Sequence, residues 1–572
     1  MSVKFFESAC LFIHDQGAPG SMFPEDPKSF IVSGTVYGTS GKPRTPEDVL
    51  KDPFILNDIE SDASIIGYDR EDDSLTLIRD PVGASPLYCA QTSRGWAAAF
   101  DLRALFKLIG EPKPDFKTLY DFLATHYRYV FRDPERTFHQ GIFQVPAGCF
   151  VVIKNGSPEK KKYLDLSLKG DYLDLSFQEA ADLYVSMLRE NVSNRLAALK
   201  GENYAFTVSS GLDSSSVAAL AAAELKKPLD CLTVSYGSSK GTPYDETAGV
   251  KALMEDTGWK LDPLEMGGGS FLKELEELME LTLAPIVTVT WLANHRLALK
   301  AREKGVTRLF SGLGGDESLA GEFEHFFLFF ADLKREGKTE LLERETSAWA
   351  ELHSTPEFPK GPKVRDAYFE RNLDFQTGVI AVDQPRYTQF REYFSPDWVR
   401  ENEDKLEAPP MPTPYPYFLS NRLFQEMSYE TSPPTLWSEA LSSRAGGIKG
   451  LFPMASPRLF RLALSLPGDY KYENGLTKMI IRRGMKGILP DRARLNPVKT
   501  GFNVPLDLFL RNESAARKAL DLLRGSPLPA LGWLKKGALE KIMADHLSSA
   551  RNNMMLLFPL IQTALFLKRQ GT

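Results

Sequence analysis

The sequence predicts an α/β protein with two domains, a sheet-rich layered domain followed by a domain built on a parallel sheet. Three observations support this prediction. The chain has 572 residues, which is too long for a single hydrophobic core. Its first part alternates short β-branched and aromatic runs with turn residues. Its second part alternates apolar strand-like runs with helix-like stretches, which is typical of a parallel sheet with covering helices.

The composition is that of an ordinary globular protein, with 43% hydrophobic and 25% charged residues. The net charge is -6 and the basic residues are spread along the whole length, so we expect no nucleic-acid partner. There is no run of 18 apolar residues and no signal peptide at the start, which predicts no membrane span and a cytoplasmic location. The four cysteines are widely spaced without a CxxC pair, which disfavours a disulfide framework or a zinc site.

Strand-like runs recur about every ten residues in the first part, which favours a layered sheet domain. We expect strands at 29–33, 63–68, 74–78, 95–100 and 148–153, and helices at 102–109 and 116–129. Near the other end of the chain, the apolar stretch 554–567 contains Pro559 and is too short to span a membrane. It predicts a helix docked on the core.

The most informative stretch of the second part runs from Asn203 to Leu225. The apolar run Tyr204–Val208 predicts a buried strand, the small residues Ser209–Ser216 a tight loop, and the Ala-rich Val217–Leu225 a helix. Unpaired backbone N–H groups and the helix dipole make such a loop a cradle for anions. Asp213 fits inside an anion site only together with a cation, and a Mg²⁺ that bridges its carboxylate to phosphates would supply one.

This loop is not a P-loop, because the Gly-Lys-Ser/Thr ending is missing. The sequence SSGLDSS instead resembles the SGGxDSS pyrophosphate loop of the ATP pyrophosphatases, the family that includes the asparagine synthetases. The resemblance implies that ATP binds here, with its phosphates at Val208, Ser209, Ser210, Gly211, Asp213 and Ser214. The alternative is a serine-rich helix N-cap without a ligand.

Further segments extend the resemblance to the asparagine synthetases. The strand-like run 230–236 is followed by Tyr-Asp-Glu at 244–246 and by a predicted helix at 247–257. The resemblance implies that Val234 and Ser235 contact adenine, largely through the backbone. The Tyr-Asp-Glu segment is equally well a helix cap.

A second glycine-rich loop, SGLGGDESLAG at 311–321, follows a strand-like run at 306–310 and resembles SGxGxDExFGG. Loops at the carboxyl ends of parallel strands line the ligand crevice of such sheets. The resemblance therefore implies that Gly312 lies at the nucleotide and that Asp316 faces Asp213. Two carboxylates favour Mg²⁺ over zinc.

Two lysines match family positions. Lys478 lies in a segment that resembles GRTKYLLREAM, and Lys499 in one that resembles RxKxGFxVPL. The segment 450–467 lies between the second loop and Lys478. It resembles RVPFLDHRLVEFALSLP, with Ser456 where Asp is usual. A lysine ammonium can neutralise a departing pyrophosphate or an oxyanion, so the resemblance implies catalytic roles. A solvated helical lysine is the ordinary alternative.

The first domain resembles the class II glutamine amidotransferases. Segment 77–88 is similar to LARDxxGxxPLYY, 100–105 to FASExKAL, and 137–148 to the end of that domain in asparagine synthetases. The resemblance implies an Ntn-hydrolase-like αββα sandwich over 1–165 and a Rossmann-like ATP-pyrophosphatase synthetase domain over 170–572. Residues 322–430 look like an insertion, which could be a lid, a partner surface or simple helical packing.

The glutaminase chemistry of that family looks lost. These enzymes use a cysteine at position 2, and here Ser2 stands there. The HRGPD segment is absent, and FNGEIYN is reduced to Ser33–Gly38 without its asparagines. Cys10 could act only after removal of the first nine residues and is better explained as a small buried residue. We therefore expect a structural domain that hydrolyses no glutamine.

The resemblance implies an ATP-dependent carbon–nitrogen ligase that adenylates a carboxylate, releases pyrophosphate and joins the acyl-AMP to an amine. Two relatives with inert amidotransferase-like domains are the β-lactam synthetases and the lasso-peptide cyclases. The β-lactam synthetases use a Tyr–Glu base pair at positions that are Leu313 and Lys449 here. Our first hypothesis is thus lasso-peptide macrolactam formation, with a precursor peptide and its protease as partners. β-Lactam or asparagine formation and a non-catalytic scaffold are the alternatives.

Overall fold

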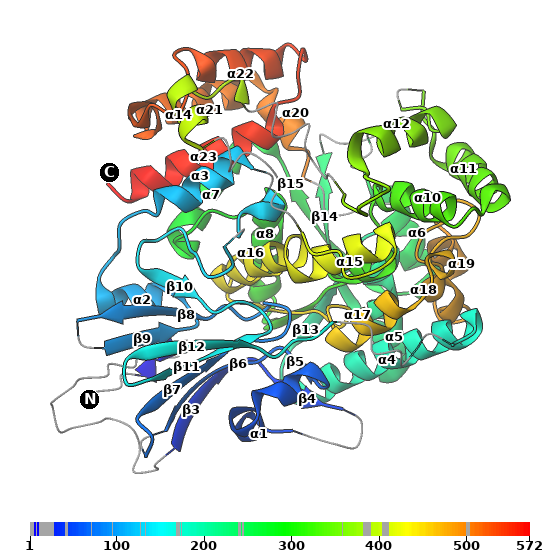
Figure 1. Ribbon diagram of the computed structural model, residues 1–572, viewed down its shortest axis with the longest axis horizontal. Coiled ribbons are helices and arrows are strands. Elements are labelled where there is room, and N and C mark those ends of the chain that lie inside the picture. Colours follow the sequence, from blue (N-terminus) through cyan, green and yellow to red (C-terminus); the bar gives the residue numbers. More distant parts are fainter. Residues whose placement is uncertain are drawn as a thin grey trace.

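The computed structural model in Figure 1 shows two sheet systems joined by a shared core. It describes residues 5–6, 9–10, 28–39, 44–69, 71–93, 95–125, 127–131, 133–166, 172, 174–237, 242, 245–356, 358–380, 391–402, 411–498 and 504–571. Within these residues, none of the helices combines the length and hydropathy needed to cross a bilayer.

The first part folds into two stacked antiparallel sheets. One has the order β12-β11-β7-β6-β3 and the other β10-β8-β9. Their strands are β3 (Lys28–Ser33), β6 (Ser64–Asp69), β7 (Ser74–Ile78), β8 (Tyr88–Thr92), β9 (Gly95–Ala99), β10 (Ile142–Gln144), β11 (Cys149–Lys154) and β12 (Ser157–Lys162). Alternate residues of both sheets, such as Leu77 and Ala98, meet in one apolar layer between them. Two short pairs join β1 (Phe5–Phe6) to β2 (Ala9–Cys10) and β4 (Val36–Gly38) to β5 (Glu60–Ser61).

Helices cover both outer faces of this sandwich. α1 (Pro46–Lys51) packs on β6, and α2 (Leu102–Ile109) packs on β8 and β9, with α3 (Phe116–Ala124) beyond it. The predicted αββα sandwich is therefore confirmed. The predicted helix 116–129 is too long, because Thr125 takes an extended conformation and ends α3.

The second part is built on a parallel sheet with the order β15-β14-β13-β16-β17, as predicted. Its strands are β13 (Tyr204–Thr207), β14 (Asp230–Tyr236), β15 (Lys260–Met266), β16 (Arg308–Phe310) and β17 (Lys449–Leu451). The chain runs outward from β13 to β15 and then returns to the other side of β13 as β16. This reversal places a crevice at the carboxyl ends of β13 and β16.

Helices pack on both faces of the parallel sheet. α4 (Phe177–Ala198), α5 (Leu212–Leu225) and α18 (Met479–Gly484) pack together on one side. On the other side, α8 (Thr290–Glu303) packs on β14 and β15 and against α16 (Ser432–Ala445). The other helices of the second part are α6 (Thr247–Thr257), α7 (Phe271–Thr282), α9 (Gly315–Leu319), α17 (Pro457–Ser465), α19 (Asp491–Arg494), α20 (Leu506–Leu510), α21 (Glu513–Gly525), α22 (Ala538–Leu547) and α23 (Met554–Arg569).

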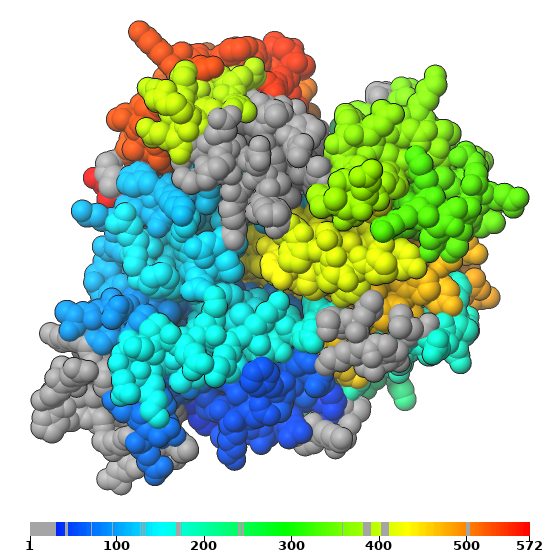
Figure 2. Space-filling model, in the orientation of Figure 1, coloured from blue at the N-terminus to red at the C-terminus, as the bar shows by residue number. Residues whose placement is uncertain are grey.

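The described residues of 322–430 fall into separate places. α10 (His325–Arg335), α11 (Thr339–His353) and α12 (Pro362–Asn372) form the green lobe at the right of Figures 1 and 2. α15 (Phe418–Ser428) runs beneath that lobe toward α16. α14 (Pro396–Asn402) instead lies near α3 and α21, where Trp398 stacks on Tyr120. An insertion over 322–430 stays a prediction, but these helices do not pack as one unit.

The two parts share a continuous apolar core. It joins the outer face of β8 and β9 to α7, α8 and α23, and the indole of Trp437 donates to Tyr88 OH at 2.8 Å. The predicted C-terminal helix, α23, is almost fully buried there despite Pro559. Lys449 at the start of β17 is half-buried and forms an ion pair with the buried Asp62, with its Nζ 3.1 Å from Asp62 Oδ1. The sandwich and the parallel sheet are thus packed as one body.

Asp62→Asn should lower the free energy of unfolding by about 3 kcal/mol at pH 7, because Lys449 would lose its buried partner. Asp62 also accepts from Thr35 N at 2.7 Å and Tyr37 OH at 2.8 Å. Burial opposes its charged form, yet Lys449 and Arg195 hold the pKa of Asp62 below its ordinary value. The stabilisation therefore exists above the unfolded-state pKa and is lost as the pH falls through the folded one.

Chemical denaturation of wild type and variant at pH 7 and at about pH 3 measures this difference, because an aspartate has an unfolded-state pKa near 3.9. The difference should shrink at the lower pH. Asp58→Asn is the matched control, because the Asp58 side chain is 71% exposed and pairs with Arg461 at the surface. If Asp62→Asn and wild type were equally stable at pH 7, the Asp62–Lys449 pair would not stabilise the interface.

Candidate active site

Two glycine-containing loops meet in the crevice at the carboxyl ends of β13 and β16. The first leaves β13 at Val208 and enters α5, whose N-cap is Gly211. The helix begins at Leu212, earlier than the predicted 217, so Asp213 and the following serines lie in its first turn. The Ser215 hydroxyl donates to Gly211 O at 2.6 Å, so it finds its hydrogen-bond partner within the helix.

Side-chain hydroxyls hold the first loop in shape. Ser209 N donates to Ser214 Oγ at 3.1 Å, the two hydroxyls lie 3.0 Å apart, and Gly211 N donates to Ser209 Oγ at 3.1 Å. Ser210 N donates instead to Glu246 Oε2 at 3.1 Å, from the N-cap of α6. Burial raises the pKa of Glu246 to about 7. The sequence predicted 244–246 only as a helix start, and Tyr244 lies outside the described residues.

Asp213 and Asp316 come together around the ammonium of Lys478. Lys478 Nζ lies 2.7 Å from Asp316 Oδ1 and also contacts Asp213 Oδ2. The two carboxylates belong to the first turns of α5 and α9, and the lysine is the N-cap of α18. Lys478 has a left-handed φ of 59°, a strained conformation that clusters at functional sites. Three residues predicted to share a site therefore do so.

Glycines of the second loop allow this close approach. A Cβ on Gly312 would lie 2.4 Å from Ser214 N, and one on Gly315 would lie 2.4 Å from Asp213 Cγ. A Cβ on Gly321 would lie 2.1 Å from both Asp316 Oδ1 and Lys478 Cε. Any side chain at these positions would push the two loops or their charged groups apart.

The donor set fits Mg²⁺. Asp213 and Asp316 offer carboxylate oxygens, the ligands that this hard cation prefers. The Lys478 ammonium between them marks a place that attracts positive charge. The hydroxyls of Ser209 and Ser214 and the N-terminus of α5 lie next to it and suit the phosphates that such a cation accompanies.

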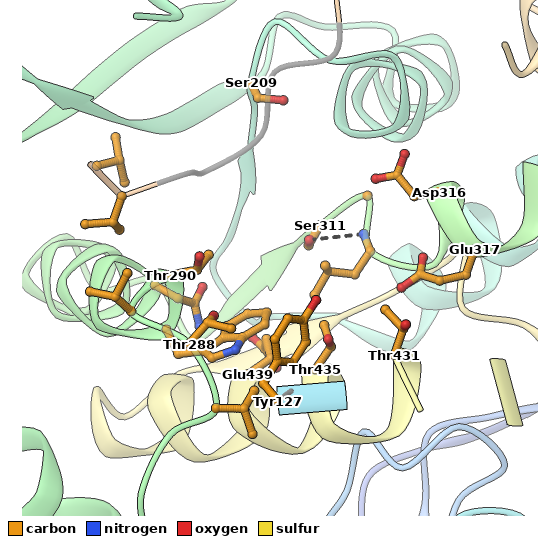
Figure 3. A pocket seen from close by; sticks show the side chains of 18 of the residues that line it. Tyr127, Ser209, Thr288, Thr290, Ser311, Asp316, Glu317, Thr431, Thr435 and Glu439 are labelled. Carbon is orange, nitrogen blue, oxygen red and sulfur yellow. Dashed lines mark hydrogen bonds between the residues drawn. The ribbon is translucent and has the colours of Figure 1, made fainter. Parts of the chain in front are cut away.

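The crevice continues into a cavity of about 580 Å³. Figure 3 shows Ser209 and Asp316 toward one end, and Thr431, Thr435, Glu439 and Tyr127 toward the other. We call this second end the far end. The first domain contributes Phe122, Thr125 and Tyr127 to its lining, and the second contributes mainly 287–291, α16 and the start of α23.

The remaining predicted residues fall into three groups. Gly312 and Val234 line the cavity with Ser209, Gly211, Asp213, Ser214 and Asp316. Val208 is fully buried behind the first loop, where its N–H donates to Leu232 O, and Ser235 is half-buried at the end of β14. Lys499 lies outside the described residues.

The two positions of the β-lactam synthetase base pair have other roles here. Leu313 is an apolar part of the cavity wall, and its N–H donates to Ser311 Oγ at 3.3 Å (Figure 3). Lys449 is used in the interface with Asp62. Neither offers a base to a substrate amine.

Two buried acids in the cavity were not predicted. Burial, followed by the charge of Asp316, raises the pKa of Glu317 to about 8, and burial raises that of Glu439 to about 7. Glu317 stands in the second loop motif, next to Asp316. Glu439 stands in α16, where no motif match exists, and its only local signal is a lone acid among small and apolar residues.

The comparisons with known proteins agree on the two-part organisation. The family model Asparagine synthase matches residues 184–568, and the model Glutamine amidotransferase domain matches residues 55–164. A protein of Mycobacterium tuberculosis named "Putative asparagine synthetase (glutamine-hydrolyzing)" is 23% identical over 455 residues, which cover 76% of this chain and 66% of that protein. "Asparagine synthetase (glutamine-hydrolyzing) 1" of Bacillus subtilis is 21% identical over 510 residues, covering 85% and 74%.

The chain thus spans about two thirds of the length of the mycobacterial relative. Among solved structures, glutamine phosphoribosylpyrophosphate amidotransferase from B. subtilis has a TM-score of 0.16 and 10% identity, covering 50% of this chain and 60% of that one.

Proposed function

The chain belongs to the asparagine synthase family, and on this premise we propose that it forms a carbon–nitrogen bond by adenylating a carboxylate with ATP. The observation that carries the proposal is the cluster of Asp213, Asp316 and Lys478 beside the first loop. The substrate carboxylate attacks the α-phosphate of ATP, which gives an acyl-AMP and pyrophosphate. An amine then displaces AMP.

The residues of the crevice have distinct parts in this proposal. The N-terminus of α5 and the hydroxyls of Ser209 and Ser214 face the departing pyrophosphate. Lys478 offsets the charge that develops on it. Asp213 and Asp316 would hold Mg²⁺, which would offset part of the negative charge of the triphosphate. Most of the acceleration then comes from positioning and from charge stabilisation.

We propose that the amine is part of the substrate and is not released from glutamine. The thiols of Cys89, Cys149 and Cys231 are buried, and burial raises the pKa of each above its ordinary value. None of these three is an activated nucleophile. The segment 33–38, which ends in the short strand β4, carries none of the asparagines of FNGEIYN. These features support the proposal that the first domain shapes the cavity and supplies no ammonia.

In its finer form, the proposal is macrolactam closure within a peptide, as in the lasso-peptide cyclases. An acidic side chain would be adenylated, and the peptide's N-terminal amine would attack it. The partners would then be a precursor peptide and its processing protease. Leu313 and Lys449 support this form over β-lactam closure, because the Tyr–Glu pair of those enzymes is missing.

Carboxylate-dependent ATP–pyrophosphate exchange tests the proposal. Peptides with a free N-terminus and an internal Asp or Glu should give exchange, AMP and a product lighter by one water. Glutamine should release no glutamate, and Ser2→Ala should behave as wild type. If the protein instead formed asparagine from aspartate and NH₄⁺, its substrate would be a small molecule and not a peptide. Absence of both ATP binding and exchange would favour a non-catalytic scaffold.

A further inference from the structure

We propose that the far end of the cavity binds the acceptor ammonium and that Glu439 accepts a proton from it. The inference rests on the proposed function and names the substrate class of its second step. That class is a primary amine on a bulky apolar body. Ammonia and amino acids with an additional carboxylate, such as aspartate, fall outside it.

Glu439 has the geometry of a ligand group. Its side chain comes from α16 and is 4% exposed. One oxygen, Oε1, accepts from Ser443 Oγ at 2.5 Å. The other, Oε2, is buried and accepts no hydrogen bond from the described residues. A buried carboxylate oxygen without a donor is costly, and a bound ammonium would supply the donor.

The neighbouring strand leaves room for this carboxylate. Gly450 in β17 lies against it, and a Cβ there would come within 2.5 Å of Oε1 and 2.8 Å of Oε2. The base position of the β-lactam synthetases is the preceding residue, Lys449, whose side chain points to Asp62. The Glu439 carboxylate of α16 therefore lies beside β17, the strand that carries the glutamate of the base pair in the β-lactam synthetases.

The charge of the lining selects a cation. Its described residues include five acids and neither lysine nor arginine. The acids are Asp213, Asp316, Glu317, Glu322 and Glu439. Lys478 contacts the first two at the phosphate end, and the described lining offers no lysine or arginine to the other three, whose charged forms a bound ammonium would stabilise. A second carboxylate on the substrate would have no basic partner among these residues, whereas an ammonium would be attracted.

The rest of the lining selects an apolar body. Phe122 and Tyr127 come from the first domain, Trp291 from α8, and Met554 and Phe558 from α23. Burial of an apolar group against these side chains is favourable, whereas free ammonia has no apolar surface to bury there. The first domain thereby acts as a wall for the acceptor.

The proton affinity of Glu439 suits this task. Burial raises its pKa to about 7, while Ser443, Asn294 from α8, Arg444 on its own helix and Lys449 from β17 act in the other direction. A base with this pKa is matched to a peptide amine, whose pKa is about 8. Amide formation should therefore rise as the pH increases through 7.

The step balances without a further reactant. The ammonium gives one proton to Glu439, and the nitrogen lone pair forms the C–N bond. The C–O bond to the phosphate then breaks, and its electron pair leaves on AMP. The nitrogen loses its remaining excess proton to water as the amide forms.

A thermal-shift titration of the full chain with 2-phenylethylamine, in the presence of ATP and Mg²⁺, tests the subsite. It measures binding alone and needs no catalytic turnover. Wild type should bind it at least tenfold more tightly than the isosteric acid 3-phenylpropionate or NH₄⁺. Glu439→Gln should lose that preference, Glu439→Asp should keep part of it, and Glu351→Gln, at an exposed site in α11, should keep all of it. Equal binding to wild type and Glu439→Gln, or no binding at millimolar concentration, would overturn the inference.

An activity readout separates this residue from the adenylation step. Glu439→Gln should leave carboxylate-dependent exchange within about threefold of wild type and lower amide formation on the order of 10²-fold, with loss of the pH dependence near 7. Hydroxylamine is neutral at pH 7 and needs no base, so hydroxamate formation should persist. Loss of hydroxamate together with exchange would overturn the acceptor role. Absence of exchange from wild type contradicts the proposed function and leaves the amine-binding result standing.

Discussion

Replacing Asp213 by asparagine is expected to lower ATP–pyrophosphate exchange by about 10³-fold, because the variant loses a charge that organises both the cation site and Lys478. The Asp213 carboxylate contacts the Lys478 ammonium, which also contacts Asp316. Asparagine has nearly the same shape and can accept a hydrogen bond, but it cannot balance a divalent cation. Exchange with saturating ATP and Mg²⁺ measures the loss directly.

The control for this variant is Asp182→Asn, an exposed aspartate of α4 whose Oδ1 accepts from Gln178 Nε2 at 2.9 Å. It should keep wild-type exchange. Circular dichroism and the thermal midpoint should show that Asp213→Asn is folded, because Asp316 remains as a partner for Lys478. If the folded variant kept more than a tenth of the wild-type exchange rate, Asp213 would not belong to the adenylation site.

The parts of this site that the sequence predicted are local ones. A strand, a small-residue loop and a helix N-terminus stand within Asn203–Leu225, and the same order recurs around Ser311–Gly321. Parallel strands bring their carboxyl ends to one edge, so two such loops must meet if their strands are neighbours. β13 and β16 are neighbours, and the pairing of Asp213 with Asp316 follows from that one contact.

The parts that the sequence did not predict depend on packing between distant elements. Glu439 resembles any helical glutamate until α16, α8 and β17 enclose it, and Lys449 has no visible partner until β17 meets Asp62 of the other domain. The lining by Phe122 and Tyr127 likewise follows from docking of the sandwich on the parallel sheet. The early start of α5 was missed for a smaller reason, since the serine hydroxyls bond back to backbone carbonyls.

These distant contacts give the sandwich a structural role toward the second domain. The outer face of β8 and β9 is part of the same apolar core as α7, α8 and α23. Asp62 of the sandwich pairs with Lys449 of β17. Removing the sandwich would open the far end of the cavity and expose that core to water. The sandwich thus supports the second domain through packing.

Gly312→Ala is expected to reduce exchange by more than about 10²-fold, because a displacement on the order of 1 Å at a reacting site has that effect. The added Cβ would lie 2.4 Å from Ser214 N and 2.7 Å from Asp213 C, and both atoms are backbone. No side-chain rotation can relieve such a contact, so the second loop must move away from the first. The KM for ATP should rise together with the fall in kcat, since the phosphate cradle and the aspartate pair both lose their spacing.

Exchange kinetics and equilibrium binding of ATP test this variant, with Gly269→Ala as the control. A Cβ on Gly269 would have no neighbour within 4 Å, so that variant should keep wild-type kinetics. Overpacking at Gly312 should also cost about 1–3 kcal/mol of stability, which chemical denaturation can measure separately. Wild-type KM and kcat in Gly312→Ala would mean that the two loops do not need their close approach for adenylation. The crevice between β13 and β16 would then not be the adenylation site.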